Sequence, residues 1–136
     1  MKELQVSPVI DNIQTITEFV TADLKDRGCS WKILRSVFVV IDEIFGNIVK
    51  YGGNSDSSPV TVRMEFEENP SALVLTFIDQ NPPFDPMDRT DPNTRLPAKM
   101  RKVGGLGIFM VKKSVDSLDH EYKDGKNILT IKKYLK

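Results

Sequence analysis

The chain has 136 residues, of which 19 are basic and 19 acidic, so its formal net charge is zero. This balance argues against a surface that binds nucleic acid or an anionic membrane. The single cysteine, Cys29, excludes an internal disulfide and a cysteine-based zinc site. The length suits one domain, expected over residues 1–136. The longest apolar run, Val37 to Ile41, is too short to cross a bilayer, and the N-terminus lacks the apolar run of a signal peptide, so we expect a soluble cytoplasmic protein.

The first elements expected along the chain are an edge strand and an amphipathic helix. Leu4 and Val6 alternate with polar neighbours, which predicts a short strand. Ser7 is a candidate N-cap with Pro8 at the first helical position, and Gly28 is a candidate stop. Between them, apolar residues recur at helical steps: Ile10, Ile13, Ile16, Val20 and Leu24. The pattern predicts a helix that covers the core with one face.

A second helix is expected to begin near Trp31, capped by Ser30, and to end around Tyr51. Its circumference is mostly apolar, which predicts the central helix of the domain. It nevertheless carries Glu43 and Asn47, which are four residues apart and therefore lie on one helical face. Buried polar groups need partners, so this pair either belongs to an internal network or dimer contact or lines a ligand site.

Two strands joined by a turn at residues 68–70 should follow. In the first, residues 60, 62, 64 and 66 are apolar and alternate with polar ones, which is typical of a sheet with one wet face. In the second, Leu73, Leu75 and Phe77 share a face, and counting on by two puts Asp79 on the same inward side. Asp79 is therefore either a turn former at the strand end or an inward carboxylate with a function.

Residues 80–103 show no periodicity and hold five of the chain's eight prolines, which predicts a long loop or lid. A third helix is expected to open at Gly104 and to run to Leu118. Strands over residues 119–122 and 127–135, joined by a turn at 124–125, should complete the fold. His120 is expected to be a solvated strand residue, because no second histidine exists for a metal site or a relay.

The start of the third helix reads Gly104, Gly105, Leu106, Gly107. Glycines at a helix start present unpaired N–H groups and the positive end of the dipole to an anion such as phosphate, although a flexible hinge has the same composition. No Gly-Lys-Ser/Thr follows, so the segment is not a P-loop, and it lacks the third glycine of a dinucleotide fingerprint. The preceding basic residues, Lys99, Arg101 and Lys102, are either a solvated loop face or phosphate contacts.

Taken together, the order of these features resembles the N, G1 and G2 boxes of the histidine-kinase-type (GHKL) ATPase superfamily. Glu43 and Asn47 lie on a helix, Asp79 stands in IDQNPPFDP, and GGLG opens a helix. Within the superfamily, the chain is similar to the small anti-sigma factor serine/threonine kinases of bacteria. The likeness covers nearly the whole chain, including the run PFDP and the closing strand NILTIKKYL.

The resemblance implies a role for each motif. Asn47 would hold Mg²⁺, Glu43 would be the general base, and Asp79 would accept a hydrogen bond from the adenine amino group. Gly104, Gly105, Leu106 and Gly107 would face the phosphates of ATP, under a lid formed by residues 86–103. The implied partners are a sigma factor and an antagonist protein, and relatives suggest a homodimer.

The chain departs from the family at three points. Asn81 stands where a glycine is usual, and asparagine tolerates positive φ better than most residues. Val103 directly precedes the glycines, so the basic residue that reaches the γ-phosphate in some members has no clear counterpart. Tyr51 stands where relatives often carry a histidine.

The expected fold is an α+β two-layer sandwich, with three helices on one face of a mixed, mostly antiparallel sheet and an ATP lid between the G1 and G2 motifs. The expected function is a Mg·ATP-dependent serine/threonine kinase that phosphorylates an antagonist protein and sequesters a sigma factor. Two alternatives remain: a binding module in which ATP controls partner binding without phosphoryl transfer, and an ATP-hydrolysing relative without a protein substrate.

Overall fold

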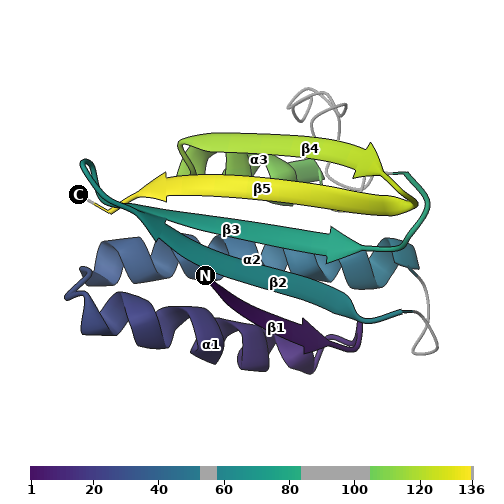
Figure 1. Ribbon diagram of the computed structural model, residues 1–136, viewed down its shortest axis with the longest axis horizontal. Helices are drawn as coiled ribbons and strands as arrows, with labels where there is room; N and C mark the ends of the chain where they lie inside the picture. Colours follow the sequence, from purple (N-terminus) through teal and green to yellow (C-terminus); the bar gives the residue numbers. More distant parts are fainter. Residues whose placement is uncertain (53–57, 84–104, 136) are drawn as a thin grey trace.

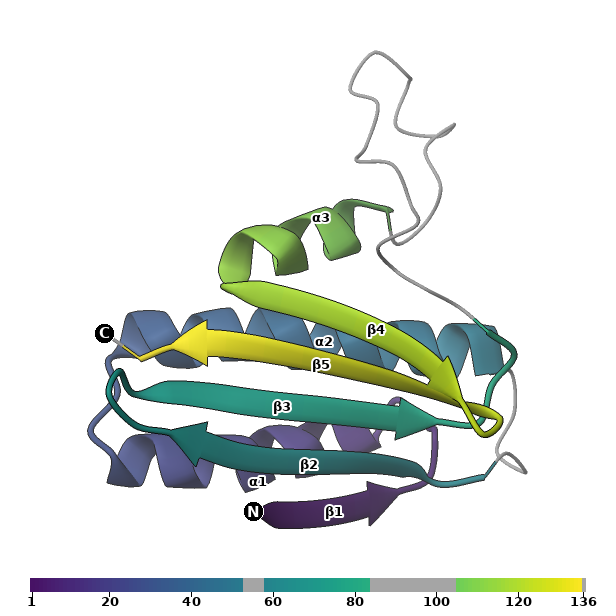
Figure 2. The same ribbon diagram turned by 45° about the horizontal axis from the view of Figure 1, so that its top comes forward.

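The computed structural model describes residues 1–52, 58–83 and 105–135. In this part of the chain, three helices cover one face of a five-stranded sheet (Figures 1 and 2). The elements, in chain order, are β1 (Lys2–Val6), α1 (Asn12–Asp26), α2 (Trp31–Gly52), β2 (Val60–Glu67), β3 (Ala72–Asp79), α3 (Gly105–Ser114), β4 (Ser117–Lys123) and β5 (Lys126–Tyr134). The two-layer α+β sandwich expected from the sequence is confirmed.

The strands lie in the order β1-β2-β3-β5-β4, and all four pairings between the described strands are antiparallel. The sequence analysis predicted a mixed, mostly antiparallel sheet. The described strands instead form a sheet in which every pairing is antiparallel. Short turns join β2 to β3 and β4 to β5, and such hairpins impose antiparallel pairing. β1 is an edge strand, as predicted, and pairs with β2 from Lys2 opposite Met64 to Val6 opposite Val60.

The alternating pattern of β2 and β3 is realised as one buried and one wetter face. Val62, Met64, Leu75 and Phe77 are almost completely buried against the helices. Arg63, on the outer face of β2, instead forms an exposed ion pair with Glu3 of β1, with 2.9 Å between Nε and Oε2. The predicted inward set of β3 is thus confirmed.

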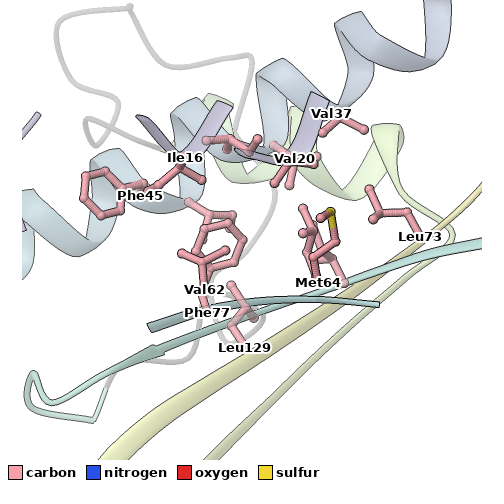
Figure 3. Close-up of a cluster of buried hydrophobic side chains, with 14 of the residues drawn as sticks. Ile16, Val20, Val37, Phe45, Val62, Met64, Leu73, Phe77 and Leu129 are labelled. Atoms are coloured by element: carbon pink, nitrogen blue, oxygen red, sulfur yellow. The ribbon is translucent and has the colours of Figure 1, made fainter. Parts of the chain in front are cut away.

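The core lies between α2 and the sheet. Ile41, Ile44 and Phe45 of α2 are at most 1% exposed. Figure 3 shows Phe45 from the helical layer and Val62 and Phe77 from the strands within one cluster of buried side chains. The Ser30 hydroxyl accepts a hydrogen bond from the Ile33 N–H at 3.3 Å, which confirms the predicted cap of α2.

α1 begins four residues later than the sequence predicts, at Asn12 instead of Pro8. Ser7 does not cap it through its side chain. The Ser7 carbonyl instead accepts hydrogen bonds from the Val9 N–H and from the Asn12 carboxamide, both at 2.8 Å. These bonds hold a turn between β1 and α1. Residues 8–11, which the sequence analysis assigned to the helix, belong to this turn instead. The predicted stop is confirmed, because Gly28 has a φ of +74°.

The sequence analysis predicted that the third helix runs to Leu118, but α3 ends at Ser114 and Leu118 lies outside it. The Asp116 N–H already donates to the Lys132 carbonyl, and Leu118 belongs to β4, where it is buried. The apolar residues 111, 115 and 118 keep helical spacing across this boundary, which explains the wrong end point. The β4–β5 turn lies at Asp124 and Gly125, with φ angles of 55° and 77°, as a tight hairpin requires.

Candidate functional site

The predicted site residues converge on one end of the fold. Glu43 and Asn47 lie in the C-terminal half of α2, Asp79 is the last residue of β3, and Gly105 is the first of α3. Figures 1 and 2 show α2 and β3 ending at the same end of the molecule, with the start of α3 facing that end. The fold thus brings motifs that are far apart in the sequence to the same end of the molecule.

Asp79 is buried, with 7% of its surface exposed, and points to the helical side of the sheet as predicted. Within the described chain, its Oδ1 accepts two hydrogen bonds, from the Asn81 N–H and from the Asn127 carboxamide, each at 3.0 Å. Both bonds go to the same oxygen. Oδ2 is therefore the oxygen that can accept a hydrogen bond from a ligand.

Burial raises the pKa of Asp79, because the low-dielectric surroundings disfavour the charged form. The hydrogen bonds from Asn127 and Asn81, and the nearby His120, act in the opposite direction and favour the carboxylate. The site thus contains an acidic group that is costly to bury but is partly compensated by its neighbours. A ligand that donates a hydrogen bond to it would compensate it further.

Asn127 is a member of the site that the sequence analysis did not identify. It lies on β5 directly opposite Asp79 in the β3–β5 register, and it is 4% exposed. The available signal was the two-residue period of β5, which puts Asn127 on the buried face with Leu129 and Ile131. A carboxamide at the first inward position of an apolar strand is as informative as the carboxylate at the end of β3.

His120 is not the solvated strand residue that the sequence analysis expected. It is half-buried on β4, and its Nε2 lies 2.9 Å from Oδ1 of Asn127. β4 pairs with β5 on the far side from β3, so the histidine reaches the network from the edge of the sheet. His120, Asn127 and Asp79 thus form a continuous chain of polar contacts across three strands.

Asn81 connects this network to the central helix. Its carboxamide donates a hydrogen bond to the Ile48 carbonyl at 3.1 Å, one residue after Asn47. The non-glycine residues with positive φ in the described chain are Asn69 and Asp124. Asn81 therefore does not use the left-handed conformation that the comparison with a glycine suggested. Its side chain fastens the end of β3 to α2 instead.

Glu43 and Asn47 differ in their surroundings. Asn47 is 9% exposed, and within the described residues its carboxamide makes no hydrogen bond. The carboxamide is not among the fully enclosed polar atoms of the described chain that lack a partner, so it stays accessible to a ligand. Glu43, one turn earlier, is half-buried, and burial together with the neighbouring Asp42 carboxylate raises its pKa. A raised pKa makes a carboxylate a better proton acceptor.

The glycine segment is described only in part. Gly105, Leu106 and Gly107 form the first turn of α3, as predicted, and α3 packs beside α2. The N–H groups of a first helical turn have no partner within the helix. Gly104, the basic residues 99, 101 and 102, and the expected lid lie outside the described residues, as does the side chain of Tyr51.

The donor set of this site suits a hard cation that is shared with a ligand. In the described part of the chain, no three His, Cys, Asp or Glu side chains are grouped so that they could hold a metal ion by themselves. The carboxamide oxygen of Asn47 is a ligand type that Mg²⁺ accepts, and Mg²⁺ commonly completes its shell with phosphate oxygens and water. The residues present therefore fit a magnesium ion that is bound together with a nucleotide.

None of the helices in the described ranges has the length and apolarity that crossing a membrane would require.

The fold and this site define a class of protein: a two-layer domain with polar groups from a helix, a strand end and a helix start around one position. The sequence profile of the histidine kinase-like ATPase domain matches residues 6–133. The chain therefore belongs to the histidine kinase-like ATPase family, and family membership implies ATP as the ligand. No curated protein sequence matches the chain.

Solved structures with the same fold include proteins from three bacteria. The structure of the RsbU and RsbW domains of a Mycobacterium tuberculosis protein has a TM-score of 0.64 at 14% identity, and the match covers 99% of this chain and 33% of that one. The SiaB–SiaC complex from Pseudomonas aeruginosa has a TM-score of 0.62 at 14% identity, and the match covers 98% of this chain and 89% of that one. The histidine kinase AdeS from Acinetobacter baumannii has a TM-score of 0.52 at 13% identity, and the match covers 99% of this chain and 68% of that one.

This chain thus spans about a third of the length of the first of these structures. At such identities the likeness concerns the fold alone.

Proposed function

We propose that the chain is a magnesium- and ATP-dependent serine/threonine protein kinase of the anti-sigma factor type. In this proposal it phosphorylates a serine of an antagonist protein and sequesters a sigma factor. The observation that carries the nucleotide part is the buried Asp79 carboxylate, whose two hydrogen bonds within the described chain are both accepted by Oδ1. Membership of the histidine kinase-like ATPase family supports kinase-type use of ATP.

Asp79 selects the base in this proposal. The exocyclic amino group of adenine donates a hydrogen bond, and Oδ2 accepts it. Guanine and hypoxanthine carry a carbonyl at the same position, which would face the carboxylate as a second acceptor. Because a hydrogen bond to a buried charged group contributes more than one to a neutral group, this contact would favour adenine over both.

Asn47 and the first turn of α3 bind the phosphate end. The carboxamide oxygen of Asn47 would be one ligand of Mg²⁺, which neutralises phosphate charge when it is bound. The N–H groups of Gly105, Leu106 and Gly107 would donate to phosphate oxygens at the positive end of the helix dipole. Gly104 would extend this segment by one residue.

Glu43 is the proposed general base. It lies one helical turn from Asn47, and burial and the Asp42 charge raise its pKa. It would accept the proton of the substrate serine as the serine oxygen bonds to the γ-phosphorus, while the bond from that phosphorus to the bridging oxygen of ADP breaks. The products are phosphoserine and ADP, with the proton on Glu43.

The partner part of the proposal is supported by the kind of assembly found among similar folds. One of them is a complex of SiaB with SiaC, and another contains RsbU and RsbW domains in one chain. We further propose that the protein is a cytoplasmic homodimer. Light scattering on the purified protein tests the dimer directly, and a monomeric mass at micromolar concentration would contradict it.

Phosphoryl transfer is tested with γ-labelled Mg·ATP and a candidate antagonist protein as the substrate. Wild-type protein should label a serine of the antagonist. Glu43→Gln should bind ATP with unchanged affinity and lose the transfer. The matched control is Glu18→Gln, which removes an exposed carboxylate from α1 and should retain transfer.

Tight ATP binding without labelling in the wild type would contradict the kinase and favour the alternative, a module in which ATP controls partner binding without transfer. Release of labelled phosphate without labelled protein would favour hydrolysis alone. A Glu43→Gln variant that loses ATP affinity would mean that Glu43 is structural.

A further inference from the structure

Asn127, the second residue of β5, contacts three acceptor atoms through its carboxamide nitrogen. Its carboxamide nitrogen lies 3.0 Å from Oδ1 of Asp79, 3.1 Å from the Asn81 carbonyl and 3.1 Å from the Pro82 carbonyl. The three partners belong to the end of β3 and the segment that follows it. One side chain of β5 therefore holds the whole strand end on which the proposed adenine contact depends.

The identity of these partners determines how the carboxamide is oriented. A carboxylate oxygen and two backbone carbonyls can only accept hydrogen bonds, so the atom that faces them must be the NH₂ group. The carboxamide oxygen must then point the other way, toward Nε2 of His120 at 2.9 Å. Because that oxygen only accepts, Nε2 of His120 must carry a proton. The network thus fixes the tautomer of the neutral histidine as well.

We propose that Asn127 is a positioning residue for recognition of the nucleotide base, and that His120 fixes its orientation. This inference rests on the proposed function, in which Asp79 accepts the adenine amino group. The NH₂ group of Asn127 occupies Oδ1 and thereby turns Oδ2 toward the ligand. The same group holds the two carbonyls that follow Asp79, which fixes the strand end from which the carboxylate projects.

The role of His120 follows from the cost of the opposite orientation. If the carboxamide of Asn127 were reversed, its oxygen would face three acceptors and its NH₂ group would face the histidine N–H. A donor at position 120 prevents this reversal without touching the nucleotide. A side chain at that position that can donate a hydrogen bond should therefore preserve recognition, and an apolar side chain of similar size should weaken it.

The test measures how strongly the protein prefers ADP to IDP. IDP carries hypoxanthine, which has a carbonyl where adenine has its amino group. Both dissociation constants are obtained by calorimetry without Mg²⁺, so that the base contact dominates. His120→Leu should reduce the ADP-to-IDP preference at least about fivefold, while His120→Gln, which retains a donor, should keep the wild-type value. Asn127→Asp, which replaces the donor by an acceptor, should reduce the preference by about tenfold or more.

Thr130→Ala is the matched control. Thr130 lies on β5 but on the opposite face to Asn127, and its removal should leave the preference unchanged. A purely structural role for the network predicts a different result: a lower melting temperature with ADP and IDP affinities falling together. That result, or equal preferences in His120→Leu and His120→Gln, would overturn the inference.

A second measurement needs no ligand. The ¹⁵N shifts of the His120 ring in the nucleotide-free protein report which nitrogen is protonated in the neutral form, and the inference requires Nε2. Protonation at Nδ1 alone would overturn it. Failure of the proposed function has a separate signature, because wild-type protein would then bind neither ADP nor ATP, and this outcome would refute the inference as well.

Discussion

Replacement of Asp79 by asparagine tests the proposed base recognition at its centre. The carboxamide has nearly the same shape as the carboxylate, and its oxygen can still accept the hydrogen bonds from the Asn81 N–H and the Asn127 carboxamide at the Oδ1 position. The new NH₂ group then takes the position of Oδ2. In the variant, a donor faces the adenine amino group, which is itself a donor.

The expected loss can be estimated from this exchange. A hydrogen bond to a charged group contributes about 1.5–3 kcal/mol. Its loss corresponds to ADP binding that is about 10- to 150-fold weaker. The effect on IDP should have the opposite sign, because the NH₂ group of Asp79→Asn can donate to the hypoxanthine carbonyl. The variant should therefore approach or reverse the preference for ADP over IDP.

Calorimetric titration of both nucleotides into both proteins measures this preference. The control is Asp119→Asn, which changes an exposed carboxylate on β4 and should alter neither affinity. Thermal unfolding of each variant shows whether the fold is retained. Equal weakening of ADP and IDP by Asp79→Asn, or no weakening of ADP, would refute the assignment of Oδ2 to the base.

Four further predictions concern the metal, the base, the core and pH. Asn47→Ala should abolish the gain in ATP affinity that Mg²⁺ gives while leaving Mg²⁺-free binding within about twofold, because its loss removes one metal ligand; a magnesium titration at fixed ATP checks this, and an unchanged magnesium dependence would contradict it. The transfer rate should fall as pH drops through the raised pKa of Glu43, since only the carboxylate accepts a proton, and a rate flat across about pH 4–7 would exclude that role. Phe77→Ala should lower the free energy of unfolding by about 3–5 kcal/mol, measured in urea, whereas Phe38→Ala, at an exposed position, should cost less than about 1 kcal/mol. Burial raises the pKa of Asp79 in the folded state, so its protonation stabilises the fold at pH values below its ordinary pKa of 3.8, and this stabilisation is lost as pH rises through the folded-state pKa. The free energy of unfolding in urea should therefore fall between about pH 3 and 6 in the wild type but not in Asp79→Asn, and the same pH dependence in both proteins would contradict this prediction.

The sequence was most informative where a single element determines which residues are buried. The apolar circumference of α2 predicted the central helix, and the two-residue period of β3 predicted an inward Asp79. Both depend on local geometry that a period expresses directly. The pairing of Glu43 and Asn47 on one face required only the 3.6-residue turn of an α-helix. Three polar groups of the candidate site could therefore be found before the fold was known.

Element boundaries were less predictable, because helical spacing continued past the true ends. Leu118 fits the period of α3 but is buried from β4, and the turn that begins at Ser7 displaces the start of α1 to Asn12. After α3, the Asp116 N–H donates to the distant Lys132 carbonyl, a partner that is not visible in a window of neighbouring residues. Before α1, the Ser7 carbonyl holds a local turn whose residues still fit the helical period.

Asn127 and His120 could not be assigned from the sequence for a related reason. Their importance comes from the registers of two strand pairs, which put Asn127 opposite Asp79 and put β4 beside β5. Periodicity predicts the face of a residue but not its neighbour across the sheet. The inward position of Asn127 was readable, whereas its partner was not.

The position of Asp79 opposite Asn127 also bears on the order in which the protein folds. The β2–β3 and β4–β5 hairpins close short loops and can form early, whereas the β3–β5 ladder joins segments that are far apart in sequence and must close a long one. The polar network of the site bridges this last ladder. The proposed base-binding surface should therefore appear late in folding. A nucleotide bound there should protect the β3–β5 amides from hydrogen exchange more strongly than those of the edge strand β1.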